Sequence, residues 1–241
     1  PMVLTRFPNG VDKKGFYEKD APQGTPSWVK TFRSYSESAE RELNYVICDE
    51  LDTLVWLANL ASIEIHMTLS RTRSFESPDF VLIDVDPEPP ASYGDAVEVA
   101  LLLKEEMDTL GLRSYVKTSG KKGLHVVIPI AQEYTFRQSR EFVRQIGEHL
   151  SKESKIVVAE FSRSRDPGTV FIDYLQNSHG RTMICPYSLR ATSRATLSMP
   201  LEWRQIRHGL NPEEFNMLSA LGNQSEPWKN LFQDKQRLSE L

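Results

Sequence analysis

"FVLIDVDPEPP", from Phe80 to Pro90, is the stretch that decides the fold. An apolar run typical of a buried β-strand leads directly into Asp84 and Asp86, and then into prolines, which end a strand. Because side chains alternate faces along a strand, both carboxylates point to one side, roughly 7 Å apart at about 3.3 Å rise per residue. Like charges this close raise each other's pKa. The pair therefore indicates either a bound cation or two solvated carboxylates at a strand end.

The composition is typical of an ordinary folded protein. The chain has 241 residues, of which 39% are hydrophobic and 26% charged, enough to bury a core. The formal net charge of −4 argues against polyanion binding by the whole surface but leaves room for a local basic face. Cys48 and Cys185 lie far apart, which argues against a disulfide framework. Without an apolar run of about 18 residues or a signal-peptide pattern, we expect a soluble, intracellular protein.

Strand-like and helix-like runs alternate along the chain, which predicts a mixed α/β or α+β fold. A hairpin is expected over 2–19, and a tail from Pro200 onward that is mostly helical. Further strands are expected at 42–48, 62–70, 113–118, 124–130 and 169–176, and long helices at 92–111 and 136–152. No linker rich in Gly, Pro or Ser divides the chain, so we predict one domain over residues 1–241.

A third carboxylate follows another apolar run. Asp173 lies in "TVFIDYLQN", where a predicted strand meets a polar segment. If this strand neighbours the one that carries Asp84 and Asp86, three carboxylates converge. Such a group binds two Mg²⁺ or Mn²⁺ ions about 3.5–4 Å apart in phosphoryl or nucleotidyl transfer. An edge position or a hydrogen bond to a turn explains a single Asp173 equally well.

The loop "TSGKKGLH" has the residue types of an anion site. Between two predicted strands, its glycines free backbone N–H groups to form a nest for phosphate. Ser119 adds a hydroxyl donor, Lys121 or Lys122 adds positive charge, and His125 begins the next strand. The alternative is a flexible glycine hairpin with solvated lysines. The spacing is not that of a Walker A motif, so a P-loop is not predicted.

Basic and aromatic side chains lie near these motifs in the sequence. Arg165 precedes Asp173 and Arg190 follows it, each beside a further arginine, and arginines can clamp phosphates bidentately. Phe16 and Tyr17 end the predicted hairpin and could stack on nucleobases. Taken singly, surface arginines are usually solvated charges, and one member of an aromatic pair in a strand usually packs into the core.

Together these blocks resemble the polymerase domain of bacterial DNA ligase D and its archaeal stand-alone relatives, members of the archaeo-eukaryotic primase superfamily. The blocks run in order from about Arg6 to Trp203 and read "RFPNGV", "GFYEK", "IEIHM", "VLIDVDP", "TSGKKGLHVVIP", "FIDYLQN", "PYSLRA" and "PLEW". The resemblance implies a primase-like fold, in which a catalytic sheet related to the RNA-recognition motif packs with a second α/β module. It also implies a template-dependent nucleotidyltransferase that fills gaps and extends DNA ends during non-homologous end joining, preferring ribonucleotides and manganese.

The resemblance also assigns the site residues motif by motif. The catalytic and metal-binding triad falls on Asp84, Asp86 and Asp173, which would hold two ions, Mn²⁺ or Mg²⁺. The aromatic pair that touches template or nucleotide falls on Phe16 and Tyr17. The residues assigned to the incoming NTP or dNTP are His66, Ser119, Lys122, His125, Arg165 and Arg190.

Partners follow from the same resemblance. They are DNA ends and gapped duplex, nucleotides, the end-binding protein Ku and a separate or fused DNA ligase, in the nucleoid-associated cytoplasm of a prokaryote. Family members carry a segment before the "RFPNG" block with basic residues for a 5′-phosphate. This sequence starts almost at that block, so we expect that segment to be missing and assign no residues to it.

Two other classes of function remain open from the sequence. A metal-dependent phosphodiesterase or nuclease could use the same three aspartates with water as the nucleophile, although it has less use for a triphosphate loop. A non-catalytic DNA-end-binding module could retain the fold, although intact aspartates and an intact Ser-Lys-His loop argue against it.

Overall fold

The computed structural model describes residues 1–37, 39–160, 166–222 and 225–238. One group of strands comprises β1 (Met2–Arg6), β2 (Phe16–Glu18), β3 (Thr31–Ser36), β4 (Arg41–Val46), β5 (Ser62–Thr68) and β11 (Thr182–Ile184). The other comprises β6 (Phe80–Pro87), β7 (Tyr115–Thr118), β8 (Leu124–Pro129), β9 (Val157–Val158), β10 (Val170–Asp173) and β12 (Pro200–Leu201). The α-helices are α1 (Leu51–Asn59), α2 (Tyr93–Thr109), α3 (Phe136–Glu153) and α4 (Met217–Ala220). The 3₁₀ turns in the described residues are η1 (Thr72–Ser74), η2 (Tyr174–Asn177), η3 (Trp203–Gln205) and η4 (Pro212–Glu214).

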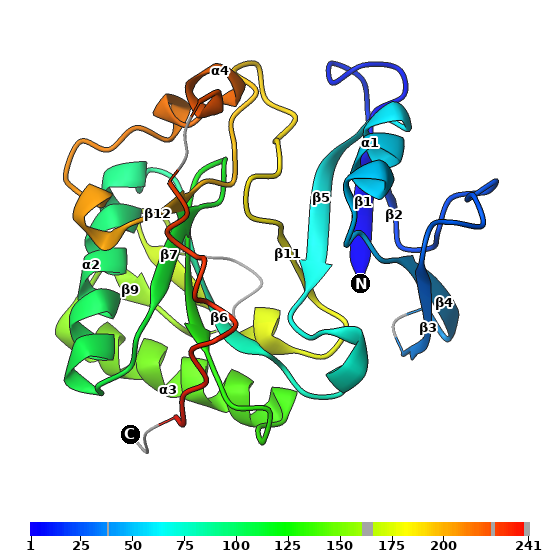
Figure 1. The fold of residues 1–241 in the computed structure, drawn as a ribbon. Helices are drawn as coiled ribbons and strands as arrows, with labels where there is room; N and C mark the ends of the chain where they lie inside the picture. Colours follow the sequence, from blue (N-terminus) through cyan, green and yellow to red (C-terminus); the bar gives the residue numbers. More distant parts are fainter. Residues whose placement is uncertain (38, 161–165, 223–224, 239–241) are drawn as a thin grey trace.

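The strands form two six-stranded sheets that stand side by side (Figure 1). The first sheet has the order β11-β5-β1-β4-β3, with β2 also paired to β1, and the second has the order β12-β7-β8-β6-β10-β9. Two sheets with their own helices confirm the predicted mixed α and β fold. Among the described residues, no helix is long and apolar enough to cross a membrane.

Helices α2 and α3 cover one face of the second sheet (Figure 1). Alternate residues of β6, namely Val81, Ile83 and Val85, are completely buried in the core that these helices share with the sheet. Each such side chain contributes roughly 1.5–3 kcal/mol by leaving water. The intervening residues Asp84 and Asp86 must therefore point to the opposite face, away from the helices.

Both long helices begin where their sequences indicate. Ser92 caps α2 and Thr135 caps α3, each with its hydroxyl accepting the backbone N–H three residues later. Asp95 and Gln138 complete the two capping boxes by accepting from the backbone N–H of the capping residue. These caps fix the helix ends against the sheet that carries the two aspartates.

The first sheet contains the predicted hairpin. Strands β1 and β2 pair antiparallel, with Arg6 opposite Phe16 and Thr5 opposite Tyr17. Helix α1 packs on this sheet through a cluster that includes Leu4 and Leu57. Strand β5 lies between β1 and β11, so this sheet presents β11 and β5 toward the second sheet (Figure 1).

Two sequence expectations differ from the structure. The strand expected over 169–176 ends at Asp173, because the Asp173 carboxylate accepts the N–H of Leu175 at 3.0 Å and starts η2. The tail from Pro200 is not mostly helical, since among its described residues it contains only short 3₁₀ turns and the four-residue α4. Its order comes instead from anchors such as Trp228, whose indole N–H donates to the Val116 carbonyl at 3.1 Å.

Asn177 continues the pairing of β6 where β10 stops. The Leu82 N–H donates to Asn177 Oδ1 at 2.8 Å, and Asn177 Nδ2 donates to the Leu82 carbonyl at 2.6 Å. The side chain is fully buried, so water cannot replace these bonds in the intact fold. The amide thus fixes the end of η2 to the centre of the strand that carries Asp84.

Asn177→Ala should therefore lower the free energy of unfolding by about 2–6 kcal/mol, because two buried backbone groups of Leu82 lose their partners at roughly 1–3 kcal/mol each. Urea unfolding measures this directly. Gln176→Ala is the matched control, expected to cost less than about 1 kcal/mol because it loses one long contact of 3.4 Å. Equal losses for the two variants would contradict the role given to Asn177.

Candidate active site

Four polar side chains form a row across the face of the second sheet that points away from α2 and α3. Lys117 on β7 lies opposite His125 on β8, His125 opposite Asp84 on β6, and Asp84 opposite Asp173 on β10. Residues paired in this way share a face, with Cβ atoms about 4.5–5.5 Å apart. Asp86 lies two residues beyond Asp84 on the same face. Strand pairing thus brings the three predicted carboxylates together.

Each carboxylate contacts a donor or cation of the protein. Asp84 lies 3.4 Å from His125 Nε2, Asp86 lies 3.1 Å from Lys122 Nζ, and Asp173 caps η2. The side chains of Asp84 and Asp86 are 23% and 22% exposed, so ligands can reach them. As these side chains are oriented, no three His, Cys, Asp or Glu residues within the described ranges are placed to hold a metal ion. Joint coordination would need side-chain rotation on a backbone that already shares one face.

His125 is buried and lies in the middle of the row, between Lys117 and Asp84. Burial, and then the charges of Lys117 and Arg190, lower the pKa of His125 well below its ordinary value of 6.5. The ring is therefore neutral at pH 7. Its Nδ1 atom is buried and has no hydrogen-bond partner in the part of the chain that the structure describes.

The Ser119–Gly123 loop is closed by its own serine. Ser119 Oγ accepts the N–H of Lys121 at 3.3 Å and the N–H of Gly123 at 3.1 Å. Gly120 has φ +73°, and a Cβ atom there would lie 2.5 Å from the Cγ atom of Arg190. A Cβ at Gly123 would lie 2.2 Å from the Val85 carbonyl oxygen. Both glycines are needed for the loop to approach β6 and Arg190 this closely.

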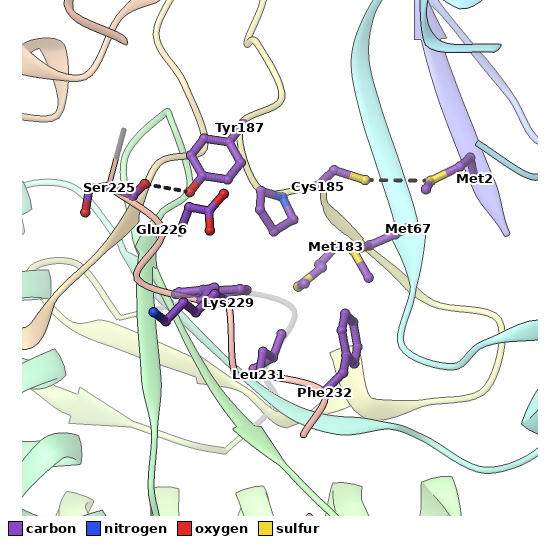
Figure 2. A pocket seen from close by; sticks show the side chains of 12 residues that line it. Met2, Met67, Met183, Cys185, Tyr187, Ser225, Glu226, Lys229, Leu231 and Phe232 are labelled. Carbon is purple, nitrogen blue, oxygen red and sulfur yellow. Dashed lines mark hydrogen bonds between the residues drawn. The ribbon is translucent and has the colours of Figure 1, made fainter. Parts of the chain in front are cut away.

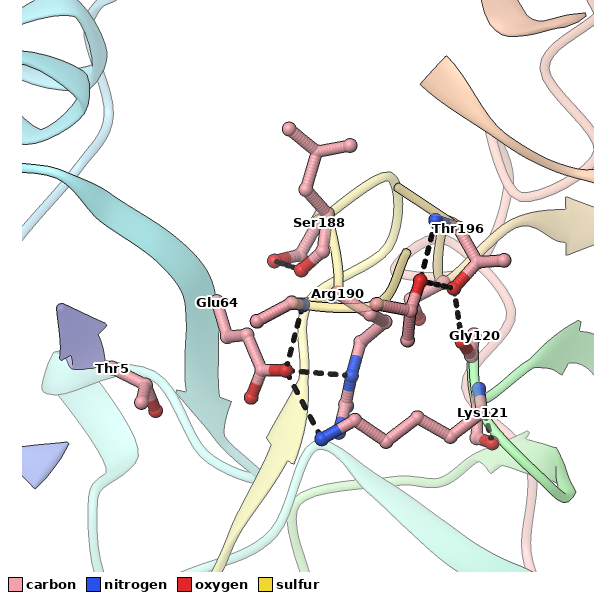
Figure 3. Close-up of polar contacts among 12 residues, drawn as sticks. Thr5, Glu64, Gly120, Lys121, Ser188, Arg190 and Thr196 are labelled. Atoms are coloured by element: carbon pink, nitrogen blue, oxygen red, sulfur yellow. Dashed lines mark hydrogen bonds and ion pairs between the residues drawn. The ribbon is translucent and has the colours of Figure 1, made fainter. Parts of the chain in front are cut away.

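The two lysines of this loop diverge. Lys122 reaches Asp86, whereas Lys121 Nζ lies 3.1 Å from Glu64 Oε1 on β5. The same Glu64 oxygen lies 3.2 Å from Arg190 Nε, so three charged groups meet between the two sheets (Figure 3). Glu64 was not among the predicted site residues. The signal for it was the alternation of β5, which places Glu64 and His66 on one face.

His66 lies beside this ion cluster. Its Nε2 atom is 3.4 Å from Thr5 Oγ1, and its ring meets the Tyr17 ring edge-on at a centroid distance of 5.7 Å. Burial first, and then the charge of Arg190, lower the pKa of His66 to about 4. His66 is therefore a neutral hydrogen-bonding group at physiological pH.

The predicted aromatic pair is accessible. Phe16 and Tyr17 are 43% and 51% exposed, so neither serves as a core residue. The Arg6 guanidinium lies 5.1 Å from the Phe16 ring centroid, and Tyr17 hydrogen-bonds Thr182 at 3.0 Å. Tyr17 therefore lies against His66, whereas Phe16, the preceding residue on β2, points to the other face of the sheet and packs with Arg6. Arg165, also predicted for the nucleotide, lies outside the described residues.

Lys117 is a second residue that sequence reasoning missed. It is completely buried, and its ammonium donates a hydrogen bond to the buried Ser198 hydroxyl. The pKa of Lys117 is lowered to about 7, chiefly by burial, while Cys185 and Asp84 act to raise it and Arg190 acts to lower it. The available signal was a lysine within the predicted strand 113–118, immediately before the Ser119–Gly123 loop.

A separate cavity of about 850 Å³ lies between β11, β5 and the segment 225–232 (Figure 2). Its walls are mostly apolar and include Met2, Met67 and Met183. The charged residues among those that line it are Glu226 and Lys229, and none of the aspartates, arginines or histidines above contributes. Lys229 is the single cation among these lining residues and Glu226 opposes its charge, so the cavity offers a triphosphate less positive charge than the polar row, which remains the candidate active site.

Comparisons with known proteins bear out the sequence resemblance. The profile of the family described as LigD, primase-polymerase domain, matches residues 1–228. The chain is 30% identical over 240 residues to the bifunctional non-homologous end joining protein LigD of Bacillus subtilis, covering 98% of this chain and 38% of that protein. It is 31% identical over 238 residues to the multifunctional non-homologous end joining protein LigD of Mycolicibacterium smegmatis, covering 94% of this chain and 31% of that protein.

Among solved structures, the polymerase domain from Mycobacterium tuberculosis ligase D in complex with DNA superposes with a TM-score of 0.85 at 26% identity. The match covers 98% of this chain and 85% of that one, and it confirms the predicted primase-like fold. The chain spans 38% and 31% of the length of the two curated relatives.

Lys117 generates a prediction about pH. The folded protein loses this proton near pH 7, whereas the unfolded chain keeps it up to about pH 10.5. The unfolded state binds more protons between these values, so stability should rise with pH there, by at most about 1.4 kcal/mol per pH unit. Lys117→Met should remove this rise. Urea unfolding of both proteins at pH 7, 8 and 9 measures the difference, and parallel pH profiles would contradict it.

Proposed function

The chain belongs to the family of LigD primase-polymerase domains, and from that premise we propose that it is a template-dependent nucleotidyltransferase. It fills gaps and extends DNA ends during repair of double-strand breaks by non-homologous end joining. The observation that carries this proposal is the pairing of Asp84 with Asp173, with Asp86 on the same face. Lysine and arginine side chains lie beside these carboxylates, as phosphoryl transfer from a triphosphate requires.

The three aspartates fit divalent cations by the chemistry of their donors. Carboxylate oxygens are the ligands that Mg²⁺ and Mn²⁺ prefer, and the side chains of Asp84 and Asp86 are partly exposed. We assign Asp84, Asp86 and Asp173 to two such ions. When bound, the ions supply acidity to the primer 3′-hydroxyl and neutralise charge on the triphosphate.

The residues of the loop and its neighbours would bind the triphosphate. Arg190 and Lys122 supply positive charge, and the Arg190 guanidinium can donate two parallel hydrogen bonds. Ser119 accepts two loop N–H groups, which leaves its own O–H to donate to a phosphate oxygen. His125 is neutral, so it contributes a hydrogen bond rather than charge. These donors oppose the charge that develops on the leaving pyrophosphate.

We further propose that the protein prefers ribonucleotides, and we assign this preference to His66. This ring is partly buried, neutral and held beside Thr5 and Tyr17, so it can hydrogen-bond a ribose 2′-hydroxyl. A site built around such a bond discriminates against the sugar that lacks it. His66→Ala should therefore reduce the ratio of NTP to dNTP incorporation.

DNA would bind beside the same site. The exposed rings of Phe16 and Tyr17 offer stacking faces for template or nucleotide bases. The solved relative was captured in complex with DNA, which supports DNA ends and gapped duplex as partners. Ku and a separate or fused DNA ligase would complete the repair in the nucleoid-associated cytoplasm of a prokaryote.

Two alternatives use part of the same architecture. A nuclease would employ the aspartates without a need for the cations around Arg190, and a non-catalytic module would need neither. Purified protein with Mn²⁺, NTPs and a labelled primer across a one-nucleotide gap separates the three. Extension by one nucleotide supports the polymerase, primer shortening supports the nuclease, and an unchanged primer supports the binding module. Parallel reactions with dNTPs and with a 5′-hydroxyl test sugar choice and end recognition.

The triad makes the sharpest prediction for this function. Asp84→Asn, Asp86→Asn or Asp173→Asn should each lower the rate of extension at least about 100-fold, since each removes several kcal/mol of charge stabilisation. Single-turnover extension with Mn²⁺ and NTP measures the loss. Asp52→Asn, at an exposed position of α1, is the matched control and should extend normally. Normal extension by Asp84→Asn would remove the triad from the mechanism.

A further inference from the structure

Glu64 carries a charge at the boundary between the two sheets. The residue is 5% exposed and lies on β5, in the first sheet. Its Oε1 atom is 3.1 Å from Lys121 Nζ, 3.2 Å from Arg190 Nε and 3.1 Å from the Ala191 backbone nitrogen, which donates to it (Figure 3). One carboxylate oxygen thus contacts three donors from two different segments of the chain.

Glu64 is ionised in this arrangement. Burial alone would raise the pKa of Glu64, but Arg190, the Ala191 N–H and Lys121 outweigh it and lower the pKa below its ordinary value. Buried charges of this kind persist only when they are paired. Removing the carboxylate would therefore take away the negative charge that lies 3.2 Å from Arg190 Nε.

The partners of Glu64 differ in their freedom to move. The Arg190 side chain is 12% exposed, whereas the Lys121 side chain is 46% exposed. Arg190 is also confined by Gly120, whose missing Cβ makes room for the Arg190 Cγ atom. Arg190 is thus held between Glu64 on the first sheet and the loop of the second sheet. Lys121 can leave Glu64 for an incoming anion.

The arginine that Glu64 holds also faces the aspartate row. The pKa of Arg190 is lowered by burial and raised again by two carboxylates, Glu64 first and then Asp84. Its guanidinium therefore lies within electrostatic reach of both sheets, between the carboxylate of β5 and that of β6. A small rotation of Arg190 would change its direction relative to a triphosphate bound next to Asp84.

We propose that Glu64 is a positioning residue that fixes the direction of Arg190 toward the β- and γ-phosphates of the incoming nucleotide. Glu64 also keeps Lys121 close to this site, from where the lysine can move to the bound nucleotide. Glu64 itself does not touch the nucleotide, since its buried oxygen is already surrounded by donors. The proposal rests on the proposed nucleotidyl transfer. It adds a residue that sets the direction of the phosphate-binding arginine and joins the two sheets at the site.

A double-mutant cycle tests this assignment. Glu64→Gln keeps the size of the side chain and removes its charge, and Arg190→Met removes the guanidinium and retains an aliphatic chain. If Glu64 acts through Arg190, Glu64→Gln should lower kcat/KM for NTP incorporation about 10- to 100-fold in the wild-type background, and less than about 3-fold beside Arg190→Met. Equal losses in both backgrounds would overturn the proposal, because a general structural defect is additive.

Controls separate this proposal from loss of fold and from failure of the proposed function. Glu42→Gln, at an exposed position of β4 in the same sheet, should leave kcat/KM unchanged. Thermal unfolding shows whether each variant is folded. If Glu64→Gln does not fold, Glu64→Asp replaces it in the cycle, since it keeps the charge but is too short to reach Arg190.

If the wild type extends no primer, the role of Glu64 can still be tested. The same double-mutant cycle is then carried out on the Kd of ATP, which calorimetry measures without primer. In that case the proposed function fails, and non-additive losses in ATP affinity still support Glu64 as the residue that positions Arg190. Additive losses in affinity, or a wild type that binds no ATP, would overturn the assignment of Glu64.

Discussion

The antiparallel pairing of β6 with β10 is the interaction on which the rest of the site depends. It sets Asp84 directly opposite Asp173 and leaves Asp86 on the same face. Like charges placed opposite each other across a sheet are destabilising. Burial of Val81, Ile83 and Val85 under α2 and α3, on the other face of β6, offsets the free energy of this repulsion. A strongly anchored strand can thus present carboxylates that no isolated strand would hold together.

The carboxylates around this pairing lie next to basic or neutral side chains. Lys122 contacts Asp86, and His125, kept neutral by burial and by nearby cations, contacts Asp84 without adding charge. Arg190 lies between Asp84 and Glu64, so positive charge separates the carboxylates of the two sheets. The formal net charge of −4 therefore gives little information about the site, where cations and carboxylates are interleaved. Such an arrangement suits a ligand that brings both metal ions and phosphates.

The sequence predicts the parts of this site that depend on local pattern. The alternation of β6 places Asp84 and Asp86 on one face, and the glycine spacing of the Ser119–Gly123 loop indicates a close approach of backbone. The sequence pattern could not predict that β10 pairs with β6, because the order of strands in a sheet depends on contacts between segments that are distant in the chain. Glu64 and Lys117 were missed for the same reason. Each becomes a site residue only through a partner far away in the chain, Arg190 and Ser198 respectively.

The most direct measurement is an anomalous-difference map from crystals grown with Mn²⁺ and a non-hydrolysable NTP. We expect Mn²⁺ peaks about 2.0–2.4 Å from carboxylate oxygens of Asp84, Asp86 and Asp173, with the triphosphate against Arg190 and the Ser119–Gly123 loop. The carboxylates should turn toward the ions and away from Lys122 and the N–H of Leu175. Mn²⁺ peaks at other residues, with these three aspartates retaining their present contacts, would contradict the assignment of the site.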